Sequence, residues 1–452
     1  MRIELNQAVE RMHAVNDKIN AVVTEVEVSE EDRSGKLANV PVVLKDNINT
    51  IGIRTTASSR ILDNYVPVYD ATIVKKLKEA GAVCIAKASM DELGMGGTNK
   101  NAFTGPVHNP YDLNRIAGGS SGGCAAMVAC GCAPLAIGTD TGDSIRKPAA
   151  YCGVIGVKPT YGRISRYGVI PYASSLDHVG YFTTNVADAA LALEVLAGRD
   201  DHDLTSSQLP VEDYHKNLNG DLAGKTIAVF KTVNDAVENA TFKDAFNALI
   251  AKAKEAGATI KEVEMPVQYM DLIAPIYETI ANAEATANHA NLDGIRFGMR
   301  EAGESVDEVM TNSRTKGFSS AVRERFVVGS YSLFDENQDL ILRKAQKLRR
   351  LLVEAYAKCF EGVDGIICLA TPSVAPCMDE EKTETTFTEE HMQLANFSGY
   401  PSMTMPLGKE NGLPFALNLT CRPFEEQTMF DLASGIEALT GLKDQCLEGE
   451  LA

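Results

Sequence analysis

Residues 117–150, AGGSSGGCAAMVACGCAPLAIGTDTGDSIRKPAA, contain the pattern that decides the fold. A glycine-rich loop leads into a helix of small residues near 123–131, then into the strand-like run APLAIGTD and a second glycine-rich loop. This alternation of short apolar strands with helices predicts an α/β sheet. Each loop also presents a serine, Ser120 and Ser144, although the stretch contains no histidine that could take a proton from either.

The same alternation extends over most of the chain. Further strands are predicted at 40–45, 82–88, 153–159, 225–230, 258–265, 365–372, 402–408 and 414–420, with helices between them at 70–82, 186–198 and 333–360. We therefore predict one large α/β domain over residues 1–452, with an open, mostly parallel mixed sheet covered by helices on both faces. An amphipathic N-terminal helix is expected within 1–30, and the polar run at 378–391 is expected to form an exposed acidic loop.

Composition excludes several classes of protein. The net charge of −18 disfavours direct binding to a polyphosphate backbone, so any nucleic acid is expected to be held by another chain. No run of about 18 uncharged apolar residues suggests a membrane span, and the first 20 residues lack the apolar core of a signal peptide. Ten scattered cysteines without a CxxC pair, and seven histidines without metal-ligand spacing, favour free thiols, a cytoplasmic location and no bound metal.

The glycine-rich loops do not match the common phosphate-binding motifs. GGSSGG has neither P-loop nor dinucleotide-fingerprint spacing, and no G-x-S-x-G elbow surrounds either serine. A simple turn is therefore one interpretation of GGSSGG, and a Ser-His-Asp triad with distant partners stays open. Lys45, at the end of the apolar run VPVVLK, is a second candidate base. To serve as one at neutral pH, its pKa must fall by roughly three units through burial.

Together these segments resemble the amidase signature family. The resemblance lies in GGSSGG, in GTDTGDSIRKPAAYCGVIGVKPTYGRISRYGV, and in the lysine segment VVLKDNINTIGIRTTASS. Within that family the chain is most similar to the A subunits of tRNA-dependent amidotransferases, through VKPTYGRISRYGVIPYASSLDHVG, RKAQKLRRLL and GLPFALNL. The resemblance extends from about residue 16 to residue 440 and implies the family's fold, an open mixed sheet between helices.

The resemblance also implies the site residues. Ser144 matches the acyl-forming nucleophile, Ser120 the bridging serine and Lys45 the base, with a cis peptide bond between Gly119 and Ser120. The resemblance further implies an oxyanion hole and a substrate-binding pair, which comprise the backbone N–H groups of Thr141, Gly142 and Asp143, and the side chains of Arg349 and Glu425. An ion pair between Asp140 and Arg146 is expected to stiffen the second serine loop.

Four positions depart from the family pattern. Asp143 and Lys147 replace the usual glycine and glutamine, Met299 replaces a common tyrosine, and Glu425 is one methylene longer than the usual aspartate. A carboxylate at residue 143 would oppose a developing oxyanion unless Lys147 or Arg146 offsets it. The serine–serine–lysine relay is intact, whereas the substrate pocket is altered.

Three functions follow from this resemblance. In the first, the chain is a glutaminase subunit that supplies ammonia for converting Glu-tRNA(Gln) or Asp-tRNA(Asn) to the amidated form. Its B subunit would bind tRNA, ATP and magnesium, a small C subunit would clamp the two, and this chain would need no cofactor of its own. The alternatives are a stand-alone amidase for another small carboxamide, and a scaffold whose site has decayed at Asp143.

Overall fold

The computed structural model describes residues 3–28, 33–380, 386–449 and 451. Eleven strands form one sheet in the order β1-β3-β2-β6-β8-β7-β12-β13-β11-β9-β10. Their bounds are β1 Val22–Glu25, β2 Pro41–Lys45, β3 Val83–Ala88, β6 Leu135–Asp140, β7 Ile155–Lys158, β8 His178–Thr183, β9 Thr226–Phe230, β10 Thr259–Val263, β11 Gly365–Leu369, β12 Ser402–Glu410 and β13 Leu413–Thr420. A separate two-stranded sheet pairs β4 (His108–Asn109) with β5 (Asp112–Ile116).

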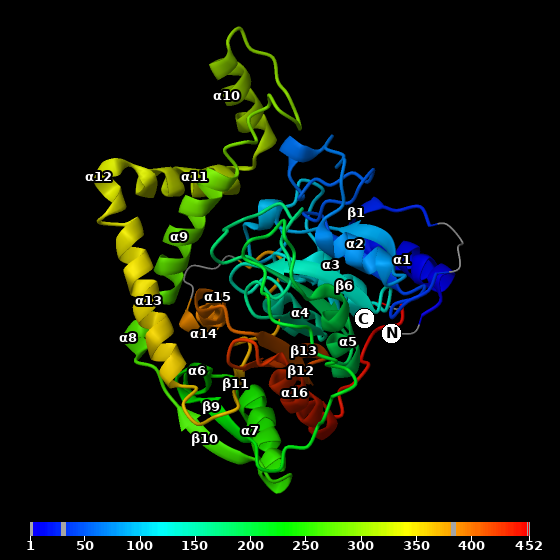
Figure 1. The fold of residues 1–452 in the computed structure, drawn as a ribbon, viewed down its shortest axis with the longest axis vertical. Helices are drawn as coiled ribbons and strands as arrows, with labels where there is room; N and C mark the ends of the chain where they lie inside the picture. Colours follow the sequence, from blue (N-terminus) through cyan, green and yellow to red (C-terminus); the bar gives the residue numbers. More distant parts are fainter. Residues whose placement is uncertain (1–2, 29–32, 381–385, 450, 452) are drawn as a thin grey trace.

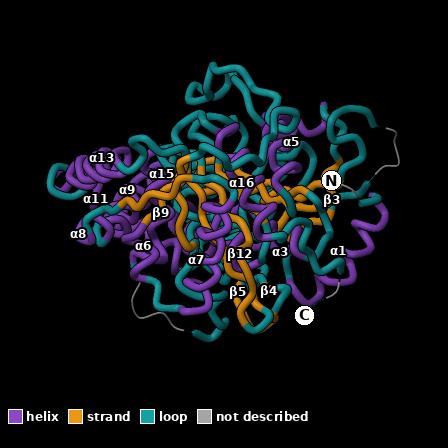
Figure 2. Tube along the Cα trace, turned by 90° about the horizontal axis from the view of Figure 1, so that it is seen from below, coloured by secondary structure: helices purple, strands orange, loops and turns teal. Residues whose placement is uncertain are grey.

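Helices cover both faces of the large sheet, and Figure 2 shows the strands running between them. The helices are α1 Leu5–Ile19, α2 Thr72–Glu79, α3 Gly122–Ala129, α4 Arg146–Cys152, α5 Val186–Leu196, α6 Lys231–Ala236, α7 Ala240–Glu255, α8 Val267–Met270, α9 Ile273–Asn288, α10 Val306–Gly317, α11 Ser320–Leu333, α12 Asp335–Gln338, α13 Leu342–Lys358, α14 Phe387–Glu390, α15 Leu394–Ser398 and α16 Glu426–Thr440. Short 3₁₀ turns occur at Arg60–Leu62, Glu92–Gly94 and His391–Gln393.

Strand alternation divides the core into two layers. In β2, Val42 and Leu44 belong to the apolar core that includes residues of α2, α5, α7 and α16, whereas Val43 belongs to the core that includes residues of α1, α3 and α4. Because successive side chains of a strand point to opposite faces, Lys45 shares the face of Val43 and points toward the start of α3. The side chain of Lys45, at the end of β2, therefore lies beside the first glycine-rich loop.

The predicted mixed α/β sheet is confirmed, but its parallel majority is not. Among the described strands of the large sheet, four neighbouring pairs are parallel and six are antiparallel. Three of the six antiparallel pairs arise because β12 and β13 form a hairpin with a short connection, and because β8 enters between β6 and β7 against both.

The predicted N-terminal helix is shorter than residues 1–30. It ends at Ile19, where Asn20 turns left-handed with φ 53° and the side-chain oxygen of Asn16 accepts the N–H groups of Ala21 and Val22. The chain then forms β1, whose residues 22–25 pair with the edge of β3. The helix predicted over 333–360 is likewise interrupted, because α12 ends at Gln338 and α13 begins at Leu342.

The loop predicted at 378–391 is exposed only in part. Residues 381–385 lie outside the described residues, and residues 387–390 form α14. Phe387 packs against the core formed by α9, α11 and α13, and His391 is buried. The apolar side chain of Phe387 therefore draws this end of an otherwise acidic segment inward.

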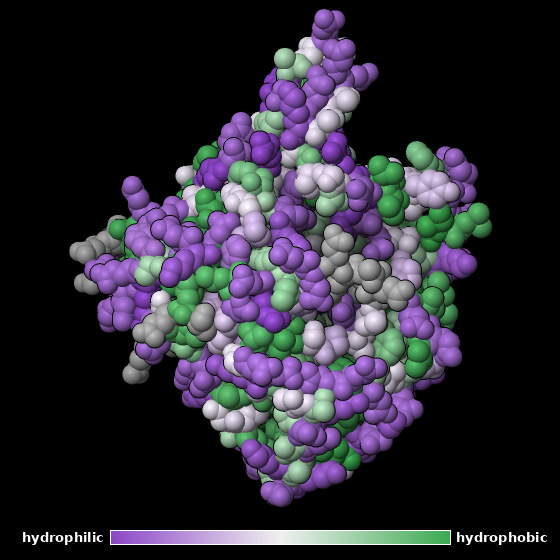
Figure 3. Space-filling view, turned by 180° about the vertical axis from the view of Figure 1, so that it is seen from behind, coloured by the Kyte–Doolittle hydropathy of each residue, from purple (hydrophilic) through white to green (hydrophobic). Residues whose placement is uncertain are grey.

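Helices α9, α11 and α13 form an arm beside the sheet, and α10 projects beyond it (Figure 1). The arm packs on β9 and β11 through a shared core that contains Phe230, Ile280, Phe326 and Leu352. No described helix is long and apolar enough to cross a membrane. The face drawn in Figure 3 is mostly hydrophilic, with hydrophobic residues scattered across it rather than joined in one band.

Candidate active site

Lys45 is fully buried at the end of β2 and reaches the first serine loop. Its Nζ lies 2.8 Å from Ser120 Oγ, 2.7 Å from Ser121 Oγ and 3.3 Å from the carbonyl oxygen of Thr139. Ser121 Oγ donates to the same carbonyl at 3.0 Å. Ser121, the neighbour of the bridging serine, therefore fixes the amine from a second side.

Burial shifts the titration of Lys45 toward the neutral amine. Burial lowers the pKa of Lys45 to about 8, although Cys124 and the carboxyl groups of Asp91, Asp140 and Asp177 act in the opposite direction. Burial therefore remains the dominant effect on this pKa, even though three acids lie nearby. A lysine with this pKa is partly neutral at pH 7–8, which is the state that a general base requires.

The two serine loops meet through the backbone. Ser121 N–H donates to the carbonyl oxygen of Ser144 at 3.2 Å, and the Gly119–Ser120 peptide bond is cis, as the resemblance implies. Ser120 and Ser144 are each almost fully buried, at 1% and 3% exposed. Among the described residues Ser120 Oγ contacts Lys45, but no hydrogen bond joins it to Ser144 Oγ. The structure therefore contains the Lys45–Ser120 contact of the predicted relay, and the loop that carries Ser144 lies beside it.

A buried ion pair closes the second serine loop, as predicted. Arg146 Nη2 lies 2.9 Å from Asp140 Oδ1 and donates to the carbonyl oxygen of Gly142 at 2.7 Å. Asp140 Oδ2 also accepts the N–H of Ile145 at 3.0 Å. Burial acts to raise the pKa of Asp140, but the charge and hydrogen bonds of Arg146 hold it well below the usual range. The loop from residue 140 to residue 146 is thus fixed at both ends.

The loop's N–H groups are free to bind an anion. The backbone N–H groups of Thr141, Gly142 and Asp143 donate to no acceptor within the described part of the chain. Thr141 is held by its side chain, whose Oγ1 donates to Asp177 Oδ1 at 2.7 Å. Asp177 Oδ2 accepts two further N–H groups, from Tyr172 and Ala173. Sequence reasoning missed Asp177, which fixes the loop from outside.

The carboxylate of Asp143 is offset by Lys147. The two side chains form a close ion pair across one helical turn, and Lys147 N–H donates to the carbonyl oxygen of Asp143 at 2.8 Å. Burial raises the pKa of Asp143 even though Lys147 opposes this shift. Glu390 of α14 is also close, and burial raises its pKa to about 7. Asp143 and Lys147, the two residues of this loop that depart from the family pattern, therefore offset each other's charge in one ion pair.

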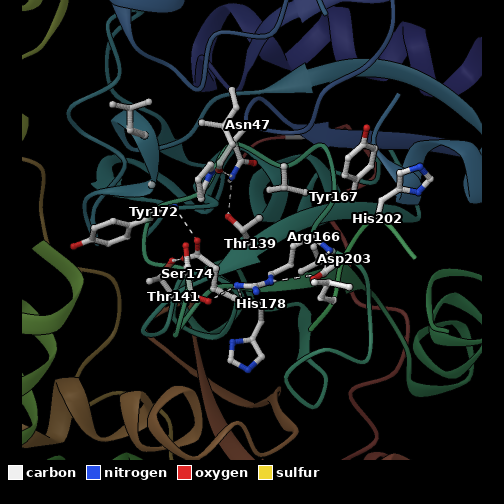
Figure 4. A pocket seen from close by; sticks show the side chains of 18 residues that line it. Asn47, Thr139, Thr141, Arg166, Tyr167, Tyr172, Ser174, His178, His202 and Asp203 are labelled. Carbon is white, nitrogen blue, oxygen red and sulfur yellow. Dashed lines mark hydrogen bonds and ion pairs between the residues drawn. The ribbon is translucent and has the colours of Figure 1, made fainter. Parts of the chain in front are cut away.

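A cavity of about 220 Å³ opens beside the end of β6 (Figure 4). Asn47 and Thr139 face one another across a hydrogen bond of 3.2 Å, and Thr141 and Asp177 line the same cavity. The remaining walls come from 93–94, 166–167, 169–172, 174, 178–179 and 202–204. Because Thr139 also contacts Lys45 through its carbonyl oxygen, the cavity borders the candidate catalytic groups.

The predicted substrate-binding pair has other partners in the structure. Arg349 donates to the carbonyl oxygen of Phe397 at 2.9 and 3.1 Å, and to Ser175 through Oγ at 3.0 Å and the carbonyl at 3.2 Å. Glu425 Oε1 accepts from Arg422 Nε at 2.9 Å. Within the described residues no contact joins Arg349 to Glu425. Met299, the other altered pocket position, is fixed by its backbone N–H to Ile61 at 2.7 Å.

Two further expectations concern ligands and cysteines. Among the described residues, no group of three or more His, Cys, Asp or Glu side chains could hold a metal ion. All ten cysteines are free thiols, and seven of them are buried. Burial raises the pKa of several of them, such as Cys124 to about 12, so these thiols are poor nucleophiles.

Comparison with known proteins supports the resemblance. The amidase family model matches residues 2–430. The A subunit of glutamyl-tRNA(Gln) amidotransferase from Carboxydothermus hydrogenoformans is 41% identical over 448 residues, with 95% of this chain and 92% of the relative covered. The corresponding protein of Moorella thermoacetica is 40% identical, with 96% and 92% covered.

Solved structures give the same result. The crystal structure of the glutamyl-tRNA(Gln) amidotransferase A subunit from Thermotoga maritima has a TM-score of 0.83 at 32% identity, covering 99% of this chain and 93% of that one. Peptide amidase from Stenotrophomonas maltophilia has a TM-score of 0.80 at 28% identity, with 98% and 94% covered. By its sequence and its fold, this chain belongs to the amidase family.

Proposed function

We propose that the chain is the glutaminase subunit of a tRNA-dependent amidotransferase. Relatives named as A subunits of glutamyl-tRNA(Gln) amidotransferase match it at about 40% identity over nearly its whole length. The observation on which the proposal mainly depends is the contact of 2.8 Å between buried Lys45 and Ser120, next to the loop of Ser144. The reaction is hydrolysis of a carboxamide, with glutamine as the amide donor.

In the proposed mechanism, Ser144 Oγ attacks the carboxamide carbon. Its proton passes to Ser120 Oγ while the proton of Ser120 passes to neutral Lys45 Nζ. The tetrahedral intermediate then collapses, its C–N bond breaks, and a proton returns along the same path to the leaving nitrogen, which departs as ammonia. Water cleaves the acyl ester by the same relay and releases glutamate.

The negative oxygen of the tetrahedral intermediate is bound by the second serine loop. The free N–H groups of Thr141, Gly142 and Asp143 form the oxyanion hole. The Asp140–Arg146 pair and Asp177 fix these donors before substrate arrives. Preorganised donors of this kind are worth about 2.7–4 kcal/mol each in transition-state stabilisation.

In the assembled enzyme, ammonia would be used by a partner. A B subunit would hold tRNA, ATP and magnesium, and a C subunit would stabilise the complex, so that Glu-tRNA(Gln) or Asp-tRNA(Asn) becomes amidated in the cytoplasm. The acidic chain, with net charge −18, suits a subunit that leaves contact with tRNA mainly to its partner. Arg349 and Glu425 would bind glutamine only after exchanging their present partners, Phe397, Ser175 and Arg422.

The experiment is co-expression of the chain with candidate B and C subunits from the same genome. A stable complex whose glutaminase rate rises when mischarged tRNA and ATP are added would support the proposal. The Ser144→Ala complex should assemble equally well and release no ammonia. Failure to form any complex, combined with full amidase activity of the chain alone, would contradict it.

A stand-alone amidase for another small carboxamide is the second candidate. The observation that favours it is the engagement of Glu425 by Arg422, which occupies the acid expected to bind an α-ammonium group. A panel of primary amides assayed on the purified chain separates the candidates. Preference for uncharged amides over glutamine would select the second.

A further inference from the structure

Four of the ten cysteines converge where the C-terminal segment meets the end of α3. Cys130 and Cys132 occupy the turn that leads from α3 to β6, and both are fully buried. Their thiols share a hydrogen bond. This bond and burial raise the pKa of Cys130, and the thiols of Cys152 and Cys446 act in the same direction, so the four sulfur atoms lie close to one another. We name these four residues the thiol cluster.

The backbone holds Cys446 against this turn. The N–H of Gly449 donates to the carbonyl oxygen of Cys130 at 2.7 Å, and Leu447 packs against the apolar core to which Cys130 belongs. A Cβ atom at Gly131 would lie 3.2 Å from Cys446 Sγ. The sulfur of Cys446 therefore lies directly over the residue that follows Cys130.

Cys446 is the member of the thiol cluster that a small molecule can reach. It is half-buried, whereas the other three members have no exposed surface. Cys446 also lines a cavity of about 590 Å³ between α1 and the start of α5, where Arg11 Nη1 donates to the carbonyl oxygen of Gly131 at 3.1 Å. Because the oxidation of a thiol depends on its exposure, Cys446 is the thiol that an oxidant meets first, and Cys130 lies behind it.

We propose that Cys446 and Cys130 form a reversible disulfide when the protein meets hydrogen peroxide. Cys446 Sγ attacks one peroxide oxygen, the O–O bond breaks, and the thiol becomes a sulfenic acid as one water molecule leaves. Cys130 Sγ then displaces the hydroxyl group of the sulfenic acid, so that the S–S bond forms and a second water molecule leaves. The two thiols lose two electrons and two protons, which the peroxide takes up as water. A small thiol reductant reverses the reaction by thiol–disulfide exchange.

The disulfide would tie the C-terminal segment to the connection between the two serine loops. Helix α3 begins directly after Ser121, and β6 leads into the loop that carries Ser144, so Cys130 lies on the segment that joins them. In a reducing compartment such a bond is transient, as in proteins that sense oxidants. The reaction uses no group of the serine–lysine relay, so it can be tested whether or not the proposed function holds.

The test treats the reduced, folded chain with hydrogen peroxide, blocks the remaining thiols and analyses the tryptic peptides without reduction. Trypsin releases Cys446 in peptide 444–452 and Cys130 in peptide 116–146. We expect a covalent pair of these two peptides that is lighter than their sum by two hydrogen atoms and that dithiothreitol separates. Fragment ions that distinguish Cys130 from Cys132 should place the bond on Cys130.

Two variants and a denatured sample provide the controls. Cys446→Ser should lose the peptide pair and unfold at the wild-type temperature, because a hydroxyl of similar size replaces a half-buried thiol. Cys377→Ser removes an exposed thiol elsewhere in the fold and should keep the pair. In urea the same treatment should give mixed links, because the fold no longer brings Cys446 to Cys130.

Three results would overturn the inference. Recovery of Cys446 only as a sulfenic or sulfinic acid would show that no thiol of the cluster reacts with it. A bond to Cys132, or a disulfide between two copies of the chain, would show that Cys130 is not the partner. The same peptide pair at equal yield in urea would show that the fold does not direct the reaction.

Discussion

The ion pair between Asp143 and Lys147 predicts a specific kinetic defect and its rescue. Lys147→Gln leaves the buried carboxylate of Asp143 without its cation, one residue before Ser144. At about 5 Å and an effective dielectric of 20, two like unit charges repel by about 3 kcal/mol, or more than 100-fold in rate. Because the developing oxyanion carries partial charge and Asp143 can take up a proton, we expect kcat to fall by about 30- to 100-fold.

The assay is steady-state amide hydrolysis by Lys147→Gln, Asp143→Gly and the double variant at one pH. The double variant removes the carboxylate together with its partner, so it should recover kcat to within about fivefold of wild type. This non-additivity measures the coupling between the two residues. If the double variant is as slow as Lys147→Gln, the loss does not come from the unpaired carboxylate, and the electrostatic reasoning is refuted.

Three further predictions follow from the same geometry. Ser144→Ala should lower kcat by about 10⁴-fold or more while leaving the folded chain intact. Turnover at the wild-type rate would show that Ser144 is not the nucleophile. Asp140→Asn, which leaves Arg146 buried without its anion, should lower the free energy of unfolding by about 3–5 kcal/mol in urea denaturation, and a change below 1 kcal/mol would contradict a structural role. Asp177→Ala frees Thr141 and should lower kcat about 10-fold or more with little change in KM, whereas a change in KM alone would indicate a substrate contact.

The sequence predicted much of the sheet because its strands are apolar. Runs such as VPVVLK and APLAIGTD became β2 and β6, and the lysine at the end of β2 reaches the serine of the first glycine-rich loop. Strand β8 was missed because its residues 178–183 follow a polar loop and begin with a histidine. Its position between β6 and β7 depends on long-range pairing that no local pattern specifies, and this pairing supplies two of the six antiparallel pairs.

The site was predictable where one short motif supplies several groups. Asp140, Arg146 and Ser144 lie within seven positions of one another, so their loop could be anticipated. Tyr277 comes from helix α9, which has no distinctive motif, and only the packing of the arm brings it to Gly142. Side chains that converge from separate helices are set by tertiary packing rather than by local spacing.

The central claim, that neutral Lys45 accepts the proton of the serine relay, is tested most directly by the pH dependence of kcat/KM. Burial lowers the pKa of Lys45 to about 8, so the protonated and inactive form dominates below that pH. We expect kcat/KM to rise about tenfold per pH unit below 8 and to level off above it, and Lys45→Met to be nearly inactive throughout. A profile that is flat from pH 6 to 9, or a Lys45→Met enzyme with wild-type activity, would contradict the account.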